Sequence, residues 1–188
     1  MFADDTKVYN ASKHHDKIQA DIQRLQEWTK IWQLYFNSMK CKVLHFGKNN
    51  PKHEYFIQND TDKVKLSQCQ QENDLGVIFD ENLSFDQHIQ SKINKANQTL
   101  GIIKRTFSFL DIDIFLRLYK SLIRPHLEYA NVIWHPHLIR QSAAIERVQR
   151  RATKLLPGFK NLSYEQRLRA IKLPTLKSRR LRGDIIQT

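Results

Sequence analysis

The sequence predicts an α+β protein, in which a half made of short strands and one helix precedes an all-helical half. Before residue 83 the apolar residues form short runs bounded by polar turns, whereas from Phe85 onward they recur every three or four positions. The charge changes along a similar division. Residues 1–91 carry 11 Lys and Arg against 13 Asp and Glu, a net charge of −2, and residues 92–188 carry 20 against 6, a net charge of +14.

The first half opens with a predicted hairpin and a helix. Asp4-Asp5 is predicted to form the turn of the hairpin, and Lys7-Val8-Tyr9 its returning strand. Asn10 or Ser12 can cap the helix that follows, because their side-chain oxygens accept from free backbone N–H groups. The apolar face of this helix contains Ile18, Ile22, Leu25, Trp28 or Thr29, and Trp32. We interpret the two tryptophans as core residues in preference to a stacking role.

Short apolar runs predict the strands of the first half at 42–47, 55–57, 64–66 and 75–79. The polar segments 49–51 and 60–62 supply turns between them. Gly76 interrupts the last strand, and a bulge or a bend is the ordinary reason for such a glycine.

Helices account for the second half. The first is long and amphipathic, with its apolar stripe at Phe85, Ile89, Ile93, Ala96, Leu100, Ile103 and Phe107. Asp111 is predicted to cap a second helix that stops near Pro125, and the apolar segment 125–134 is predicted to be buried. Another helix is predicted at 142–156, and Ser163 opens a capping box with the Gln three residues later.

Composition indicates an ordered chain with two parts. Its 188 residues are 40% hydrophobic and include only five Gly and five Pro, enough for one domain or one and a half. We place the boundary where the hydrophobic period changes, which gives domains 1–82 and 83–188. A near-neutral domain followed by a very basic one suggests a catalytic or structural platform joined to a polyanion-binding part. The alternative is a soluble basic surface without a partner.

Several classes of function are not indicated. Cys41 and Cys69 stand alone, without the spacing of a zinc site or a disulfide framework, so reduced thiols in an intracellular protein are the expectation. His14-His15 and His135-Pro136-His137 lack Cys or carboxylate partners at ligand spacing. No apolar run approaches the length of a membrane span, and the N-terminus has no signal-peptide pattern. The sequence does not distinguish nucleus from cytoplasm.

Cations cluster in three helical segments of the second half. In the segment 142–156, an apolar stripe contains Ile145, Val148, Ala152 and Leu155, and a stripe of cations is displaced from it by roughly 130°. Such a helix suits a phosphate backbone that is contacted without base readout. A solvated charged face is the alternative for any single helix. The clusters are Lys92, Lys95, Lys104 and Arg105; Arg147, Arg150, Arg151 and Lys154; and Arg179, Arg180 and Arg182.

A series of sequence blocks points to a known family. In order along the chain they are Phe2-Ala3-Asp4-Asp5-Thr6-Lys7, Leu25-Gln26-Glu27-Trp28, Trp32-Gln33-Leu34-Tyr35-Phe36-Asn37, Lys40-Cys41-Lys42-Val43, Asp74-Leu75-Gly76-Val77, Leu118-Tyr119-Lys120-Ser121-Leu122-Ile123-Arg124-Pro125-His126-Leu127-Glu128-Tyr129-Ala130, Val148-Gln149-Arg150-Arg151-Ala152-Thr153-Lys154, Leu162-Ser163-Tyr164-Glu165 and Leu173-Pro174-Thr175-Leu176. Through these blocks the chain resembles the reverse transcriptase of non-LTR (LINE-type, jockey-like) retrotransposons. The blocks are collinear over nearly the whole sequence.

The resemblance implies a polymerase site in the first domain. Residues 1–82 would be a partial palm, made of short antiparallel strands with one helix. Asp4 and Asp5 would be the catalytic carboxylates and the ligands of Mg²⁺, or of Mn²⁺ in its place. Lys40 would lie near the triphosphate of the incoming dNTP, where a Lys can act as a point charge or a general acid.

The resemblance also implies how nucleic acid would be held. Leu75 and Gly76 look like the primer-grip hairpin, where Gly lets a nucleic-acid strand approach the backbone closely. Residues 83–188 would be a helical, basic, thumb-like region. Its cation clusters would contact the RNA template, the DNA primer and the RNA–DNA hybrid that the two form.

The family needs a further Asp from an earlier palm strand, and this sequence has none ahead of Met1. We therefore expect a fragment of an RNA-directed DNA polymerase that binds template–primer, is not catalytically competent alone and does not retain Mg²⁺ by itself. Whether the chain is an enzyme is left open. One alternative is a non-catalytic nucleic-acid-binding remnant. Another is a structural or interaction protein whose partner surface surrounds Val132-Ile133-Trp134. No membrane partner is expected.

Overall fold

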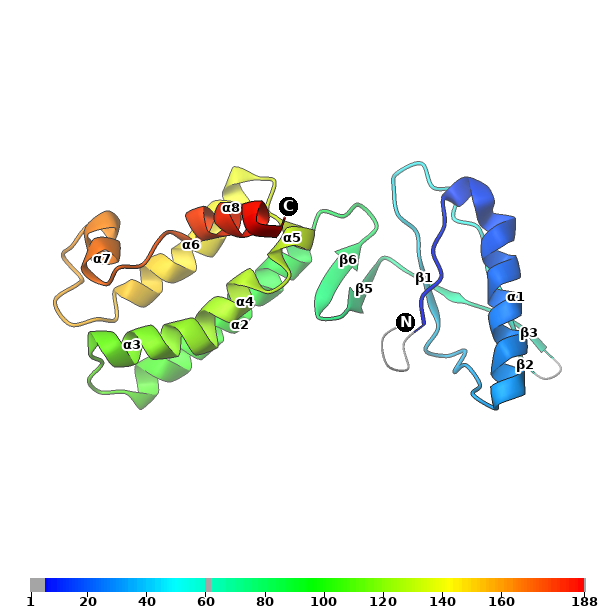
Figure 1. The fold of residues 1–188 in the computed structure, drawn as a ribbon, viewed down its shortest axis with the longest axis horizontal. Helices are drawn as coiled ribbons and strands as arrows, with labels where there is room; N and C mark the ends of the chain where they lie inside the picture. Colours follow the sequence, from blue (N-terminus) through cyan, green and yellow to red (C-terminus); the bar gives the residue numbers. More distant parts are fainter. Residues whose placement is uncertain (1–5, 60–61, 188) are drawn as a thin grey trace. The chain divides into compact units, whose positions relative to one another are not determined.

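The computed structural model describes residues 6–59 and 62–187, and the chain forms two compact units (Figure 1). Unit 1 contains Met1–Asp74 and Phe79–Ser84, and unit 2 contains Leu75–Ile78 and Phe85–Thr188. Short strands occur together with many helices, so the predicted mixed α and β class is confirmed at that level. No helix among the described residues has both the length and the apolar character needed to cross a bilayer.

Unit 1 combines a helix with short strands. Its elements are the 3₁₀ turn η1 (Ser12–His14), α1 (His15–Trp32), β1 (Lys42–Leu44), β2 (Phe56–Asn59), β3 (Asp62–Lys65), β4 (Ser67–Cys69) and β5 (Gln71–Asp74). β2 and β3 pair antiparallel, with Ile57 opposite Val64, and β1 pairs parallel with β4. The small core holds Tyr55, Ile57 and Leu66, and Ile18 and Ile22 of α1 pack against it. Strands at 42–44, 56–59 and 62–65 lie close to the predicted positions, but the parallel pairing of β1 with β4 differs from the antiparallel arrangement that was expected.

Three predictions for the N-terminal segment are wrong. Neither Asn10 nor Ser12 caps α1, because the turn η1 precedes this helix and its N-cap residue is His14. The described residues of the predicted returning strand, Lys7–Tyr9, form no strand, because no neighbouring strand among the described residues pairs with them. Trp28 and Trp32 are not core residues, since they are 43% and 63% exposed. α1 instead turns Gln26 and Thr29 inward, and the Gln26 side chain bonds the backbone N–H and C=O of Gln58 on β2.

The prediction of a single strand at 75–79 is also wrong, because the chain forms a hairpin turn at the start of this segment. β5 runs back along β6 (Val77–Asp80), and Leu75 and Gly76 form the two-residue turn between them. Both turn residues have positive φ, 46° at Leu75 and 81° at Gly76. Two positive φ angles are what a type I′ hairpin turn requires, and Gly adopts them without steric cost.

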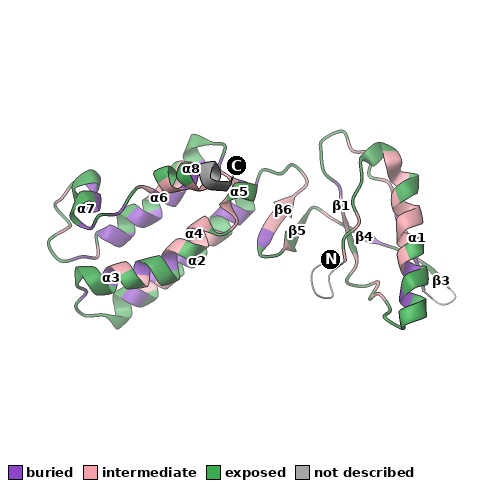
Figure 2. Cartoon of the chain, in the orientation of Figure 1, coloured by how far each residue is buried: buried purple, intermediate pink, exposed green. Residues whose placement is uncertain are grey.

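Unit 2 is helical apart from the first residues of β6. Its helices are α2 (Asp86–Thr106), α3 (Ile112–Leu118), the π-helical segment η2 (Tyr119–Ile123), α4 (Arg124–Glu128), α5 (Asn131–Trp134), α6 (Ile139–Thr153), α7 (Tyr164–Ala170) and α8 (Leu176–Gln187). The predicted long helix is confirmed, and its apolar stripe from Ile89 to Ile103 is buried. α2 packs against α4 and α6, and α6 also packs against α8 (Figure 2).

Local signals explain several helix ends in unit 2. The Asp111 side chain accepts from the backbone N–H of Ile114, and Ser163 forms the predicted capping box with Gln166. The helical conformation does not end at Pro125 as predicted, however, but continues to Glu128. Proline has no N–H to give to the carbonyl four residues earlier, and the Arg124 N–H instead reaches the carbonyl of Tyr119, five residues back. Pro125 then lies in the first turn of α4, where a missing N–H costs nothing.

Burial of the segment 125–134 is only partly as predicted. Leu127 and Trp134 are buried, and the indole N–H of Trp134 donates to the carbonyl of Tyr129 at 2.7 Å. Val132 and Ile133 are half exposed, because α5 is a single helical turn and only one of its sides faces the core.

His88 makes the stability of unit 2 depend on pH. Its side chain is fully buried, and Nδ1 accepts from the backbone N–H of Ile78 at 3.1 Å, which requires a neutral ring. Burial, and secondarily the charge of Lys92, lowers the pKa of His88 to about 4. The unfolded chain takes up a proton near pH 6.5 and the folded chain only near pH 4. The free energy of unfolding should therefore fall as the pH falls, by about 1.5 kcal/mol between pH 6.5 and pH 5.

Urea denaturation at a series of pH values measures this dependence. His88→Asn is the matched variant, because its side-chain oxygen can still accept from Ile78 without titrating. It should lose the His88 contribution between pH 6.5 and pH 5. Identical pH profiles for the two proteins would contradict the assignment.

Candidate nucleic-acid interface

The outer side of α6 is a continuous cationic face. Counted at 100° per residue, its cations fall within an arc of about 100° on the side opposite Ile145. All of them are exposed, and they are Arg140, Arg147, Arg150, Arg151 and Lys154. We call this set the α6 cation face. Glu146 is the acidic residue of α6, and its carboxylate is bound elsewhere. The face therefore presents positive charge without an acidic residue within its arc.

A buried polar network anchors the opposite side of α6. Gln149 is buried, and its amide nitrogen donates to the hydroxyl of Tyr164 and to the carbonyl of Pro174, at 3.0 Å each. The Tyr119 hydroxyl donates to the amide oxygen of Gln149. The Glu146 carboxylate accepts from Tyr164, and burial with this bond raises the pKa of the tyrosine. These bonds fix the rotation of α6 about its axis, and hence the direction of its cations.

Glu146 also holds the start of α8. Its carboxylate accepts from the backbone N–H groups of Leu176 and Lys177, at 3.2 Å each. An anion at this position satisfies free N–H groups and complements the positive end of the helix dipole. The one acidic side chain of α6 is thus engaged in holding α8.

The members of the α6 cation face differ in how firmly they are held. The Arg150 guanidinium lies 4.6 Å from the ring centroid of Tyr164, and Arg151 donates to the Asn97 side chain of α2 at 2.9 Å. Arg140 is 3.5 Å from the carboxylate of Asp86. Arg147 and Lys154 make no ion pair with any described residue. Two cations are thus pre-positioned by uncharged partners, and none of their charge is neutralised by these contacts.

The cations of α2 occupy two places. Lys92 and Lys95 lie near His126 of α4, and after burial their charges are the next causes that lower the pKa of this histidine. Lys104 and Arg105 lie exposed in the last turn of α2, where cations complement the negative end of the helix dipole. The structure therefore divides this predicted cluster between the α4 side of α2 and its C-terminal end.

The three arginines of α8 are not alike. Arg179 donates to both carboxylate oxygens of Glu128, and this hydrogen bond raises the pKa of the guanidinium. Arg180 is only 2% exposed and donates to the hydroxyl of Ser142 at 3.0 Å. Arg182 is exposed. Arg179 and Arg180 therefore hold the helices of unit 2 together, and their charges serve packing within the unit.

The predicted primer-grip residues form the hairpin turn, and the turn is supported from within unit 2. The Tyr129 hydroxyl donates to the carbonyl of Leu75 at 2.8 Å. A Cβ added at Gly76 would lie 3.5 Å from the ring of the same tyrosine. The turn is therefore a fixed backbone feature, with the Leu75 side chain half exposed.

The predicted catalytic residues are only partly covered by the structure. Asp4 and Asp5 lie outside the described residues. Lys40 is exposed in a turn, where its backbone N–H donates to the carbonyl of Asn37 at 3.0 Å. Lys7, which closes the acidic motif, forms an ion pair with Asp74 across 67 positions of sequence. The start of the described chain and the residue before the hairpin turn are thus brought together.

The fit of Mg²⁺ depends on residues that the structure does not describe. Within residues 6–59 and 62–187, no group of three or more His, Cys, Asp or Glu side chains is arranged to hold an ion. Asp4 and Asp5 are of the oxygen-donor type that Mg²⁺ prefers. The described part contributes no ligand set, and we derive no catalytic step through a metal.

One cation was missed by the sequence analysis. Arg140 belongs to the α6 cation face, but the predicted helix began at residue 142, whereas α6 begins at Ile139. Its place seven residues before Arg147, two helical turns, is the signal that could have found it.

Two of the relatives found by comparison with known proteins are RNA-directed DNA polymerases of mobile elements. Over 170 residues the chain is 26% identical to the "Probable RNA-directed DNA polymerase from transposon X-element" of Drosophila melanogaster. Over 140 residues it is 29% identical to the "RNA-directed DNA polymerase from mobile element jockey" of Drosophila funebris. The chain is similar to RNA-directed DNA polymerases of jockey-like mobile elements. The resemblance predicted from the sequence blocks is therefore confirmed.

This similarity to jockey-like polymerases covers much of the chain but little of its relatives. The two alignments take in 84% and 69% of this chain, and 18% and 14% of the two polymerases. An uncharacterized protein of Caenorhabditis elegans is 25% identical over 112 residues, which are 58% of this chain and 57% of that protein. No protein-family profile matches the chain. No solved structure matches it either.

Proposed function

We propose that this chain is the template–primer-holding part of a jockey-like RNA-directed DNA polymerase, and that unit 2 grips the RNA–DNA hybrid through the α6 cation face. The observation that carries the proposal is the arrangement of five cations on one exposed side of a single anchored helix. Two of them, Arg150 and Arg151, are held by uncharged groups and stay available to phosphates. The similarity to polymerases of mobile elements supports nucleic acid as the polyanion.

The charge of unit 2 suits a long-range attraction as well as a contact. Residues 92–188 carry a net charge of +14, and a positive field of this kind raises the rate at which a polyanion associates. Each phosphate that a Lys or Arg neutralises releases counterions, which makes binding depend on salt. Because arginines on a helix contact phosphates without reading base edges, we expect little dependence on sequence.

The finer assignments of the polymerase site belong to the same proposal. Residues 1–82 would be part of the palm and 83–188 the thumb. Asp4 and Asp5 would be the metal-holding acids of the intact enzyme, with Mg²⁺ supplying charge stabilisation for phosphoryl transfer. Lys40 would lie near the triphosphate of the dNTP and act there as a point charge or a general acid. The Leu75–Gly76 turn, held by Tyr129, would support the primer.

Fluorescence anisotropy with a labelled RNA–DNA hybrid of about 14 base pairs tests the proposal. In 50 mM NaCl we expect saturable binding with a dissociation constant below about 1 μM, against the 10⁻⁴–10⁻⁶ M typical of non-specific binding at physiological salt. A hybrid of a second, unrelated sequence should bind within about threefold of the first. Failure to bind either hybrid at 50 mM NaCl would contradict the proposal.

Binding and polymerisation can be separated in the intact enzyme that carries this segment. Asp4→Ala should abolish primer extension there and leave hybrid affinity unchanged, because the acidic pair acts on metal and not on the duplex. A loss of hybrid affinity in this variant would contradict the assigned roles.

An interaction protein is the second candidate, and the exposed apolar residues of unit 1 favour it. Trp32 and Tyr35 are 63% and 71% exposed, at the end of α1 and in the loop after it. Single exposed apolar residues are common, but a group of them marks a partner surface. Self-association in sedimentation velocity, without hybrid binding at 50 mM NaCl, would favour this candidate over the first.

A further inference from the structure

Two glutamine side chains of α1 close one edge of β2. The Gln19 amide donates to the carbonyl of Phe56 at 2.9 Å and accepts from the N–H of the same residue at 3.0 Å. The Gln26 amide does the same at Gln58, at 2.7 Å and 3.1 Å. Figure 1 shows α1 beside the strands of unit 1. Each side-chain amide therefore takes the place of a peptide group from a neighbouring strand, at every second residue of β2.

The closed edge is the one that β3 does not use. In an antiparallel ladder, successive residues direct their backbone groups to opposite sides of the strand. The carbonyl of Tyr55, just before β2, accepts from the N–H of Leu66 at 2.8 Å and so faces the β3 side. The groups of Phe56 and Gln58 face the other way. Within the described residues β2 and β3 form a sheet of two strands, so without the glutamines this edge would be open to a further strand.

The sequence of this strand favours pairing with a second copy of itself. Residues 55–59 are Tyr-Phe-Ile-Gln-Asn, with no charged residue, no Pro and no Gly. Uncharged windows of about five to seven residues, rich in aromatic and β-branched side chains, are the ones that associate through strand edges. The cations of β3, Lys63 and Lys65, lie opposite Gln58 and Phe56, one strand away from the outer edge. Two such strands can therefore pair antiparallel about a two-fold axis without like charges meeting at the seam.

We infer that the outer edge of β2 is a docking site for the same strand of a second copy of this chain, and that Gln19 and Gln26 hold this site closed. The two amides belong to the same chain as β2, so their effective concentration at the edge is far higher than that of a second copy. Self-association through β2 then requires that these bonds are first broken. All of these residues lie in unit 1, so the inference is independent of the function proposed for unit 2.

Replacing Gln19 and Gln26 together by Leu tests the inference, because Leu keeps a side chain of similar size without the amide. The double variant should self-associate about 10-fold or more tightly than the wild-type chain in sedimentation equilibrium, since the backbone groups of β2 become available to a second strand. Adding Gln58→Lys should reverse this gain, because two copies would then bring like charges to the paired edge.

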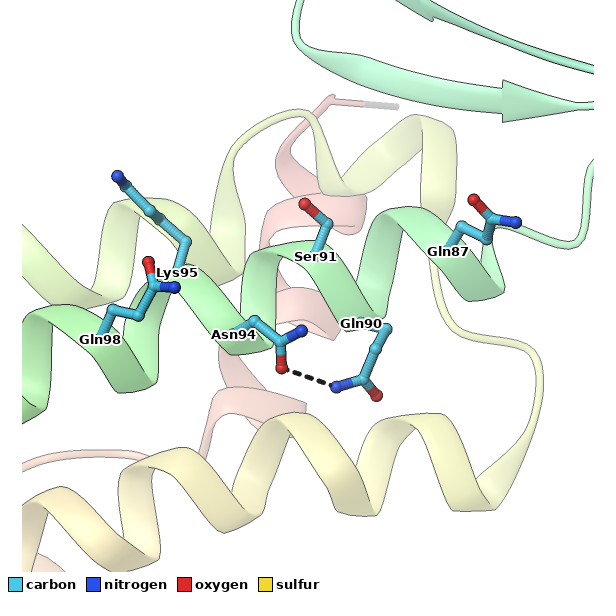
Figure 3. Close-up of a pocket in the computed structure, with 6 residues that line it drawn as sticks. All are labelled: Gln87, Gln90, Ser91, Asn94, Lys95 and Gln98. Carbon is cyan, nitrogen blue, oxygen red and sulfur yellow. Dashed lines mark hydrogen bonds between the residues drawn. The ribbon is translucent and has the colours of Figure 1, made fainter.

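The matched control makes the same two replacements at exposed glutamines. Gln23 is exposed on α1, and Gln98 projects from the exposed side of α2 (Figure 3). Because this variant adds two leucines to the surface and leaves the edge of β2 closed, it should associate no more tightly than the wild-type chain.

Hydrogen exchange locates the association on the chain. The amide protons of Phe56 and Gln58 should be protected in the wild type and exchange quickly in the dilute double variant. They should be protected again when that variant is concentrated, because a partner strand replaces the glutamines. The amide proton of Ile57, which faces β3, should stay protected throughout. If the double replacement unfolds unit 1, Ile57 loses its protection as well, and Gln19→Leu alone makes the same test at Phe56.

A folded double variant that associates no more tightly than the wild type, or that associates equally well with Gln58→Lys, would overturn the inference. So would protection of Phe56 that does not return as the concentration rises. These results leave hybrid binding by unit 2 untouched, and a chain that binds no hybrid would overturn the proposed function while the closed edge of β2 remains.

Discussion

Replacing Arg147, Arg150, Arg151 and Lys154 together by Gln is expected to weaken binding of an RNA–DNA hybrid by about 10²–10³-fold at 0.1 M salt. Each cation that contacts a phosphate contributes about 0.9 to the slope of log affinity against log salt concentration. The variant should therefore show a slope shallower by about 3 to 4. Gln keeps a polar side chain without the charge, and the affected positions are exposed, so the fold should be retained.

A matched variant removes the same number of charges elsewhere. Lys13, Lys17, Lys30 and Lys48 are exposed residues of unit 1, and their replacement by Gln changes the net charge of the chain by the same four units. This control should lose less than about fivefold in affinity and keep its salt slope. Equal losses in the two variants would mean that total charge, and not the α6 cation face, determines binding.

Gln149→Met is expected to destabilise unit 2 by about 3 kcal/mol. Methionine fills a similar volume but cannot hydrogen-bond to the hydroxyls of Tyr119 and Tyr164 or to the carbonyl of Pro174. Each buried polar group that loses its partner costs about 1–3 kcal/mol, and neighbouring bonds in such a network support one another. Denaturation by urea, followed by circular dichroism, measures the change.

Gln98→Met is the control for this prediction, because it makes the same replacement at an exposed position of α2. It should change the free energy of unfolding by less than about 0.5 kcal/mol. If Gln149→Met were as stable as the wild type, the network would not be what fixes the rotation of α6.

Elements with a strong hydrophobic period could be predicted from the sequence. α2 and α6 were found because residues such as Ile93 and Ile145 recur at helical spacing and pack into one core. The Ser163 capping box was found because it depends on neighbours in the sequence alone. The cations of α6 could also be grouped from the sequence, because the helical period of 3.6 residues determines which side chains share a face.

Elements that depend on distant partners could not be predicted. Arg180 looks like Arg182 in the sequence, and only the packing of α8 against α6 shows that it is buried beside Ser142. Trp28 and Trp32 continue the apolar pattern of α1, but the strands of unit 1 cover only the side of the helix that carries Gln26.

The hydrophobic pattern did not reveal the hairpin at residues 71–80, because β5 is short and polar, and only the resemblance of Leu75 and Gly76 to the primer-grip hairpin indicated it. Its turn, Leu75–Gly76, carries a weaker signal than Asn-Gly or Asp-Gly.

The salt dependence of hybrid binding by the wild-type chain tests the central claim most directly. Anisotropy titrations of one labelled RNA–DNA hybrid between 50 and 300 mM NaCl give the slope of log affinity against log salt concentration. A grip by the α6 cation face predicts a slope of about −4 or steeper, as four or more phosphates are neutralised. A slope shallower than about −1 would show that the cations of α6 do not hold the nucleic acid.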